Sequence, residues 1–140
     1  MQAQALQGLS VLVVEDDRDT GELFTVFLSR AGAHVQTSNS AEGALALLAN
    51  WRPDVVLCDL HLPEIDGYGL LERIRADVTL RDLPVIAISG SHPTIERDRA
   101  LLAGFAAHLP KPSKLRDLLI AIASVIATPT LVTELRGAPR

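Results

Sequence analysis

Five short apolar runs, separated by segments with helical spacing, constrain the fold of this chain most strongly. The runs are nearly continuous in apolar residues, which is typical of strands whose sheet is covered on both faces. We predict strands at residues 10–15, 33–37, 55–58, 84–88 and 106–109. Helices must then pack on both sides of a parallel sheet and connect its strands by right-handed crossovers. The sequence therefore predicts an α/β fold, a doubly wound parallel sheet with five strand-helix units.

Helical periodicity follows each predicted strand. In the first helical segment Leu23, Phe24 and Phe27 share one face, and Gly32 ends the helix. The predicted helices cover residues 18–31, 41–50, 67–74, 93–103 and 114–126. Their predicted N-caps include Ser40, Asp66 and Ser113. The same helix also carries more apolar residues than a single buried face can hold, among them Phe24, Val26 and Leu28. We therefore expect partner proteins to dock on this first helix.

Length and charge limit the classes of protein that this chain can belong to. Its 140 residues suit a single domain, which we place at residues 10–127, with a lead-in at 1–9 and a tail or linker stump at 128–140. The 17 acidic and 13 basic residues give a net charge of −4, and there is no Lys/Arg-rich run. Direct binding to nucleic acid is therefore not expected.

Cysteine content and hydropathy give the expected compartment. Cys58 is the only cysteine, so an internal disulfide is ruled out, a cysteine-ligated zinc site is implausible, and we expect a buried thiol. The first nine residues lack a basic segment followed by an apolar one, and no apolar run approaches the roughly 20 residues that span a bilayer. We expect a cytoplasmic protein without membrane contact.

Charged residues stand where several predicted strands end. Glu15 and Asp16 follow the first strand, Asp59 follows the third and Lys111 follows the fifth. Because carboxyl ends of parallel strands share one edge of a sheet, these groups should meet there. Two carboxylates about 4 Å apart repel by roughly 4 kcal/mol at an effective dielectric constant of about 20. A divalent cation would relieve this repulsion, so the sequence predicts a metal site.

These residues belong to longer motifs that end successive strands. In chain order the motifs are Val13-Val14-Glu15-Asp16-Asp17, Asp59-Leu-His-Leu-Pro63 with Asp66-Gly67, Ser89-Gly90, and Lys111-Pro112. Together and in this order they resemble the receiver domain of two-component response regulators over about residues 10–127. The resemblance implies a flavodoxin-like (βα)5 fold with strand order 2-1-3-4-5. It then places the acids at the topological switch point, where such sheets bind ligands.

The resemblance also implies a reaction. Asp59 would take a phosphoryl group from a phosphohistidine on a sensor histidine kinase or a histidine phosphotransfer protein. Lys111 and Ser89 would contact the phosphoryl group, and the bond before Pro112 would be cis. Such a domain catalyses its own phosphorylation and dephosphorylation without turning over a separate substrate. The protein would be a monomer or weak dimer.

A magnesium ion is the cofactor that the resemblance implies, with Mn²⁺ as an alternative. Asp16 would contact the metal directly, together with Asp59 and the backbone carbonyl of His61, and Glu15 would act through water. Mg²⁺ prefers oxygen ligands and keeps several waters, which suits a site of few carboxylates. A metal contact from the imidazole of His61 is not expected.

Other positions concern the signal and its lifetime. His108 stands where the family usually has Tyr or Phe, the aromatic residue that moves with Ser89 during switching. The output switch of this chain is thus expected to be weak, different or absent. His61, Gly90 and Ser91 stand where the family tunes the dephosphorylation rate.

One alternative remains open from the sequence, a protein interaction module that keeps the fold without phosphorylation, and two other classes lack residues that they need. A haloacid dehalogenase type of phosphatase needs a second acid where His61 stands, and a flavin binder needs a phosphate loop where Glu15 to Asp17 stand. The residues before the first strand and residues 104–112 resemble the corresponding segments of receivers that are attached to hybrid sensor kinases. The chain is therefore either a piece of such a kinase or a stand-alone receiver.

Overall fold

The computed structural model describes residues 5–90 and 92–126, and these residues form five strand-helix units. The strands are β1 (Ser10–Val14), β2 (His34–Ser38), β3 (Val55–Asp59), β4 (Val85–Ser89) and β5 (Ala107–Pro110). The helices are α1 (Arg18–Arg30), α2 (Ala41–Leu48), α3 (Gly67–Ala76), α4 (Pro93–Ala103) and α5 (Leu115–Val125). All neighbouring strands pair in parallel, in the order β2-β1-β3-β4-β5. The predicted fold class and strand order are confirmed.

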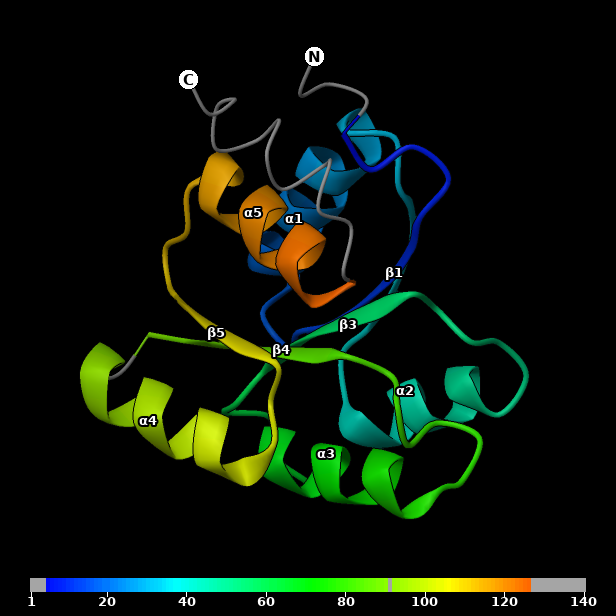
Figure 1. Cartoon of the computed structure of the whole chain (residues 1–140), viewed down its shortest axis with the longest axis vertical. Helices are drawn as coiled ribbons and strands as arrows, with labels where there is room; N and C mark the ends of the chain where they lie inside the picture. Colours follow the sequence, from blue (N-terminus) through cyan, green and yellow to red (C-terminus); the bar gives the residue numbers. More distant parts are fainter. Residues whose placement is uncertain (1–4, 91, 127–140) are drawn as a thin grey trace.

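Helices cover both faces of the sheet, as the apolar strands require. Figure 1 shows α1 and α5 on one side of the sheet and α2, α3 and α4 on the other. Alternate residues of β1 serve the two cores, because Val11 and Val13 join the α1/α5 side whereas Leu12 and Val14 join the opposite side. Every residue of β3 and β4 is buried. Full burial of one Val, Leu or Ile side chain stabilises the fold by about 1.5–3 kcal/mol.

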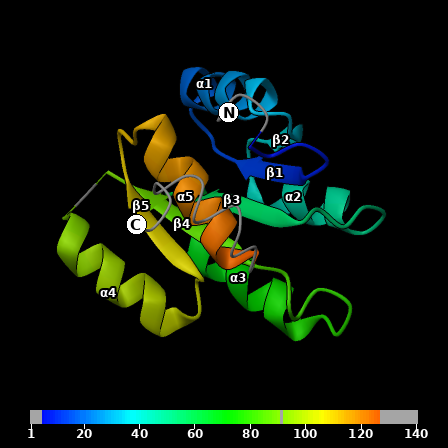
Figure 2. The same ribbon diagram turned by 45° about the horizontal axis from the view of Figure 1, so that its top comes forward.

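Strand β2 differs from the central strands because it lies at the edge of the sheet. Figure 2 shows β2 and β1 on one side of the molecule, and β5 beside α4 on the other. No residue of β2 is fully buried. Its polar residues Gln36 and Thr37 are compatible with this position, since an edge strand has only one neighbouring strand.

Helix α1 turns a different face to the core from the one predicted. Its buried residues include Phe24 and Leu28, whereas Leu23 is 50% exposed and Val26 is 44% exposed. The prediction that Leu23 shares the buried face was therefore wrong. Phe24 and Leu28 are likewise not available for docking, because both pack into the core on the α1/α5 side. The exposed apolar residues of α1 are Leu23 and Val26.

The predicted helix caps are correct in two cases of three. The side chains of Ser40 and Asp66 each accept a hydrogen bond from the amide three residues later, at 3.0 and 2.9 Å. Ser113 does not cap α5. Its hydroxyl donates instead to the carbonyl oxygen of Pro110, and Lys114, the residue before the helix, makes no capping bond with its side chain.

The segment before β1 takes part in the core. Leu6 is fully buried, and its amide donates to the carbonyl oxygen of Ala31 at 2.8 Å. The predicted tail at 128–140 lies outside the described residues. Among the helices of the described residues, none has the length and apolar character needed to cross a membrane.

Candidate functional site

Three acidic side chains meet at the carboxyl edge of the sheet. β1 and β3 are neighbours with Val14 opposite Cys58, so the residues that follow Val14 come close to Asp59. Carboxylate oxygens of Glu15, Asp16 and Asp59 all lie within 4.8 Å of one another. Glu15 and Asp59 are buried, whereas Asp16 is exposed. The predicted convergence of these three acids is thus present in the structure.

Lys111 reaches the two buried acids from the end of β5. Its ammonium nitrogen lies 2.5 Å from Oε1 of Glu15 and donates a hydrogen bond to Oδ2 of Asp59 at 3.1 Å. The backbone amide of Lys111 donates to the carbonyl oxygen of Ser89 at 2.9 Å, and the peptide bond before Pro112 is cis. The lysine side chain therefore passes the end of β4 to neutralise the carboxylates of Glu15, which follows β1, and Asp59, which ends β3.

The two buried acids differ in their tendency to ionise. Burial, together with the neighbouring Asp59, raises the pKa of Glu15 from 4.5 to about 7, and Lys111 only partly opposes this. Burial also opposes a charge on Asp59, but the Glu15 carboxyl, the His61 amide and Lys111 outweigh it and lower the pKa of Asp59. Asp59 therefore carries the negative charge that a nucleophile needs.

The acidic cluster suits a divalent cation that prefers oxygen. Oε1 of Glu15 is buried, and although it lies in an ion pair with Lys111, it has no hydrogen bond of good geometry among the described residues. Three carboxylates so close together offer the ligands that Mg²⁺ prefers. The imidazole of His61 is not part of this set, since its Nε2 lies 2.7 Å from a carboxylate oxygen of Glu96.

Glu96 of α4 is a residue that the sequence analysis missed. It is 7% exposed, and its second carboxylate oxygen accepts a bond from the hydroxyl of Tyr68 at 3.4 Å. The guanidinium of Arg99 lies over the Tyr68 ring, 4.6 Å from its centroid. Glu96 precedes buried Ala100 by one helical turn, and this spacing is the signal that could have shown that it faces inward. Through His61, the loop after β3 is thus tied to α4.

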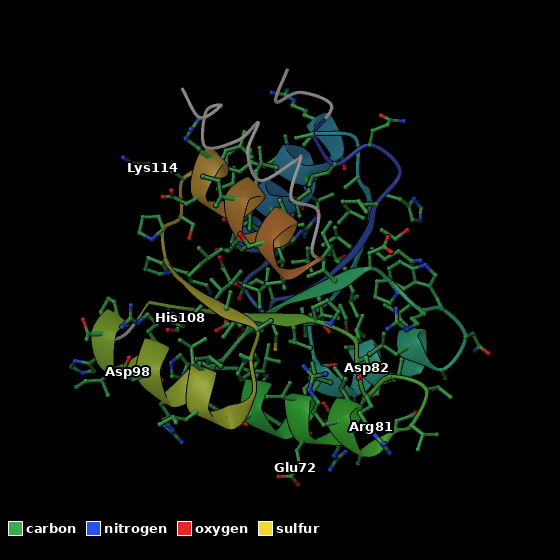
Figure 3. The ribbon with its side chains drawn as sticks, viewed as in Figure 1. Glu72, Arg81, Asp82, Asp98, His108 and Lys114 are labelled. Atoms are coloured by element: carbon green, nitrogen blue, oxygen red, sulfur yellow. The ribbon has the colours of Figure 1, made fainter. Side chains whose placement is uncertain are left out.

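Ser89 and His108 form a second contact beside the acids. Ser89 is fully buried, and its Oγ lies 2.8 Å from Nε2 of His108. Figure 3 labels His108 on β5, on the side of the molecule where Asp98 marks α4. Burial lowers the pKa of His108, with Glu96 opposing this effect and Arg97 adding to it. The two residues predicted to take part in switching are therefore bonded to each other.

The other predicted site residues are placed as follows. Gly90 leaves space beside Lys111, because a Cβ added to it would come no closer than 3.7 Å to Cβ of that lysine. Ser91 lies outside the described residues. Asp17 caps α1 by accepting from the Thr20 amide at 3.0 Å. Cys58 is fully buried, and burial strongly raises the pKa of its thiol.

Comparison with known proteins identifies the family. A sequence model of the response regulator receiver domain matches residues 11–123. The chain belongs to this family. Receiver domains of this family act in two-component signalling. They generally bind Mg²⁺, and the cluster of three acids in this chain is compatible with such an ion. Histidine kinases or phosphotransfer proteins are their general partners.

Proteins with similar sequences include a response regulator. The chain is 37% identical to an uncharacterized 14.6 kDa protein from the sodA1 3′ region of Leptolyngbya boryana, covering 78% of this chain and 83% of that protein. It is 35% identical to response regulator MprA of Mycobacterium sp. strain KMS, over 83% of this chain but only 50% of MprA. This chain therefore spans about half the length of that regulator.

A solved structure similar to this receiver domain contains a metal ion. It is the receiver domain of sensor histidine kinase PA1611 from Pseudomonas aeruginosa PAO1, with magnesium coordinated in its active site cleft. The two chains are 29% identical with a TM-score of 0.79, and the match covers 86% of this chain and 99% of the other. Receivers from both response regulators and sensor kinases are thus similar to this one.

Proposed function

We propose that Asp59 accepts a phosphoryl group from a phosphohistidine, in a reaction that requires Mg²⁺. The observation that carries this proposal is the position of the Asp59 carboxylate. One oxygen accepts from the His61 amide at 2.9 Å and the other from the Lys111 ammonium at 3.1 Å, with Glu15 and Asp16 alongside. Such contacts hold a carboxylate ionised and oriented for attack.

The reaction is a displacement at phosphorus. A carboxylate oxygen of Asp59 forms a bond to phosphorus as the bond between phosphorus and the donor imidazole nitrogen breaks, and that nitrogen keeps the electron pair. Lys111 offsets negative charge on the phosphoryl oxygens, and the Ser89 hydroxyl donates to one of them. The backbone of Gly90 leaves room for the group. Hydrolysis of the acyl phosphate by water returns Asp59 to its starting state.

The acidic residues would hold the metal. Asp16 and Asp59 would contact Mg²⁺ directly with the carbonyl oxygen of His61, and Glu15 would act through water. The ion supplies positive charge that offsets the charge of the transferring group. Because Lys111 pairs with Glu15 and Asp59 in this structure, metal binding would compete with that ion pair.

The phosphodonor would dock over α1. Leu23 and Val26 are the exposed apolar residues of this helix. Val26 also lines an open cavity of about 640 Å³ between α1 and β2, which Asp16 borders on the side of the acidic cluster. A donor protein that covers these residues would bring its phosphohistidine to the edge of the sheet where Asp59 lies. The cytoplasmic location and the monomeric or weakly dimeric state expected from the sequence stay predictions.

Phosphorylation by a small donor tests this function directly. Wild type, Asp59→Asn and Asp82→Asn are each incubated with acetyl phosphate and Mg²⁺, and intact mass spectrometry counts the phosphoryl groups added. Asp82 is an exposed acid, labelled in Figure 3 near Arg81 and on the opposite side of the molecule from His108. We expect one phosphoryl group on wild type and Asp82→Asn, and none on Asp59→Asn or on wild type with excess EDTA. Equal labelling of Asp59→Asn would refute the assignment.

A further inference from the structure

The bond between Ser89 and His108 is decided by the register of two strands. His108 lies opposite Ala87, and Ser89 lies opposite Pro110, so Ser89 and His108 are diagonal neighbours on the same face of the sheet. That face packs against α2, α3 and α4, since Ala87 belongs to its core. Among the described residues, neither side chain makes another side-chain hydrogen bond. Each is therefore oriented by the other.

A separation of 2.8 Å between Oγ and Nε2 allows two arrangements of the hydrogen atoms. A neutral imidazole carries one N–H, and a hydroxyl carries one O–H. If the imidazole proton is on Nδ1, the Ser89 hydroxyl donates to Nε2 and its hydrogen points at the ring. If the proton is on Nε2, the ring donates to Oγ, and the Ser89 hydrogen is free to donate to another acceptor.

The neutral form of His108 is favoured by its surroundings. Burial lowers its pKa, and the charged groups that act on it are Glu96 and Arg97, both on α4. The neighbouring strand β4 carries no charged residue. Leu109, the next residue of β5, packs into the core on the α5 side, so His108 lies on the opposite face and does not face α5. The choice between two neutral tautomers is therefore the relevant one.

We propose that phosphorylation of Asp59 selects the tautomer of His108 with its proton on Nε2, and that His108 thereby positions the Ser89 hydroxyl for the phosphoryl group. This inference rests on the proposed function. Of the two neutral tautomers, only this one lets Ser89 donate to a phosphoryl oxygen while it stays bonded to His108, and this difference is what shifts the equilibrium. One proton leaves Nδ1 for water and another reaches Nε2 from water, so the net charge is unchanged. The imidazole is partly exposed, which gives water access to the ring.

Nitrogen NMR of the histidine rings tests the tautomer directly. The protein has 4 histidines, and His108→Gln identifies the signals of His108. Spectra are recorded for the metal-free protein and for the protein with Mg²⁺ and beryllofluoride, which mimics a phosphoryl group. We expect the fraction of Nε2–H to increase and to dominate in the beryllofluoride state. An unprotonated Nε2 in that state, or an unchanged ratio of tautomers, would overturn the proposed role of His108 and leave the proposed function untouched. If beryllofluoride does not bind at all, the proposed function fails and the inference with it.

Rates of phosphorylation test whether His108 acts through Ser89. His108→Phe keeps a ring but loses the donor, whereas His108→Gln keeps an N–H. With acetyl phosphate and Mg²⁺, we expect His108→Phe to be up to about tenfold slower than wild type, the upper end of the effect of one hydrogen bond between neutral groups. We expect His108→Gln to recover most of this rate. In a Ser89→Ala background, His108→Phe should have no further effect, and an undiminished tenfold loss there would contradict positioning through Ser89.

Discussion

Replacement of Glu15 by glutamine should stabilise the metal-free protein at alkaline pH. The pKa of Glu15 is about 7 in the folded protein, against an ordinary value of 4.5. A folded-state pKa above the unfolded one means that ionisation opposes folding, so the wild type loses stability as pH rises from 4.5 through about 7. At 1.36 kcal/mol per pH unit, the full loss is about 3 kcal/mol. The neutral amide of glutamine removes this loss.

The measurement is the free energy of unfolding in urea with EDTA, followed by far-UV circular dichroism. At about pH 5 we expect wild type and Glu15→Gln to be similar, and at about pH 8 we expect the variant to be more stable by up to about 3 kcal/mol. Asp59 does not contribute in this window, because its lowered pKa costs stability only as pH falls below 3.8. Glu72→Gln is the control, since Glu72 is exposed on the outer side of α3 (Figure 3). Its curve should run parallel to that of wild type.

Magnesium should reduce this difference in stability. Mg²⁺ at ten times its dissociation constant stabilises the protein that binds it by about 1.4 kcal/mol. Wild type should gain this stability at alkaline pH, and Glu15→Gln should gain less. If the curves of wild type and Glu15→Gln without metal stay parallel from about pH 5 to about pH 8, burial does not hold the Glu15 proton, and the reasoning is refuted.

Three further tests, two of them with a control substitution, probe the packing around the site by urea unfolding. Gly67→Ala would place a Cβ 2.7 Å from the backbone oxygen of Asp59 at the end of β3, so we expect the free energy of unfolding to fall by at least about 2 kcal/mol. Gly21→Ala is the control, because its Cβ would have 3.9 Å of room and should be neutral or slightly stabilising. Equal effects of the two substitutions would contradict this expectation. Leu28→Ala should cost about 2–5 kcal/mol and Val26→Ala less than about 0.5, and the reverse order would show that α1 turns its other face inward. Glu96→Ala should cost about 0.5–1.5 kcal/mol by removing the acceptor of the His61 imidazole, which is 56% exposed and can bond to water instead, and an unchanged stability would show that this contact contributes nothing.

The sequence predicted the sheet and the acids at its edge because both depend on local patterns. Runs that are apolar throughout indicate strands buried on both sides, and the residues that follow such strands must lie at one edge. Glu15, Asp59 and Lys111 could therefore be brought together without coordinates. The direction of the Lys111 side chain also follows from the sequence, because the two carboxylates at the same edge attract its ammonium group.

The remaining features depend on how elements are rotated against each other. Both Leu23 with Phe27 and Phe24 with Leu28 have the spacing of one helical face, and the rotation of α1 that buries the second pair also sets Gly21 against the side chain of Glu15. The inward position of Glu96 likewise depends on the rotation of α4. The expected cap at Ser113 failed because α5 begins at Leu115, so Lys114 and not Ser113 stands at the N-cap position.

Cys58 gives this chain a natural probe of its own opening. Its thiol is the only one present, and it lies in the central strand next to the residue proposed to be phosphorylated. Its side chain lies in the core between the sheet and helices α2, α3 and α4, so a reagent that alkylates thiolates cannot reach it while these helices cover that face. Each labelled molecule therefore records an opening of this packing. The labelling rate of the native protein, with and without Mg²⁺, would report how firmly an occupied site holds the helices against the sheet on which it is built.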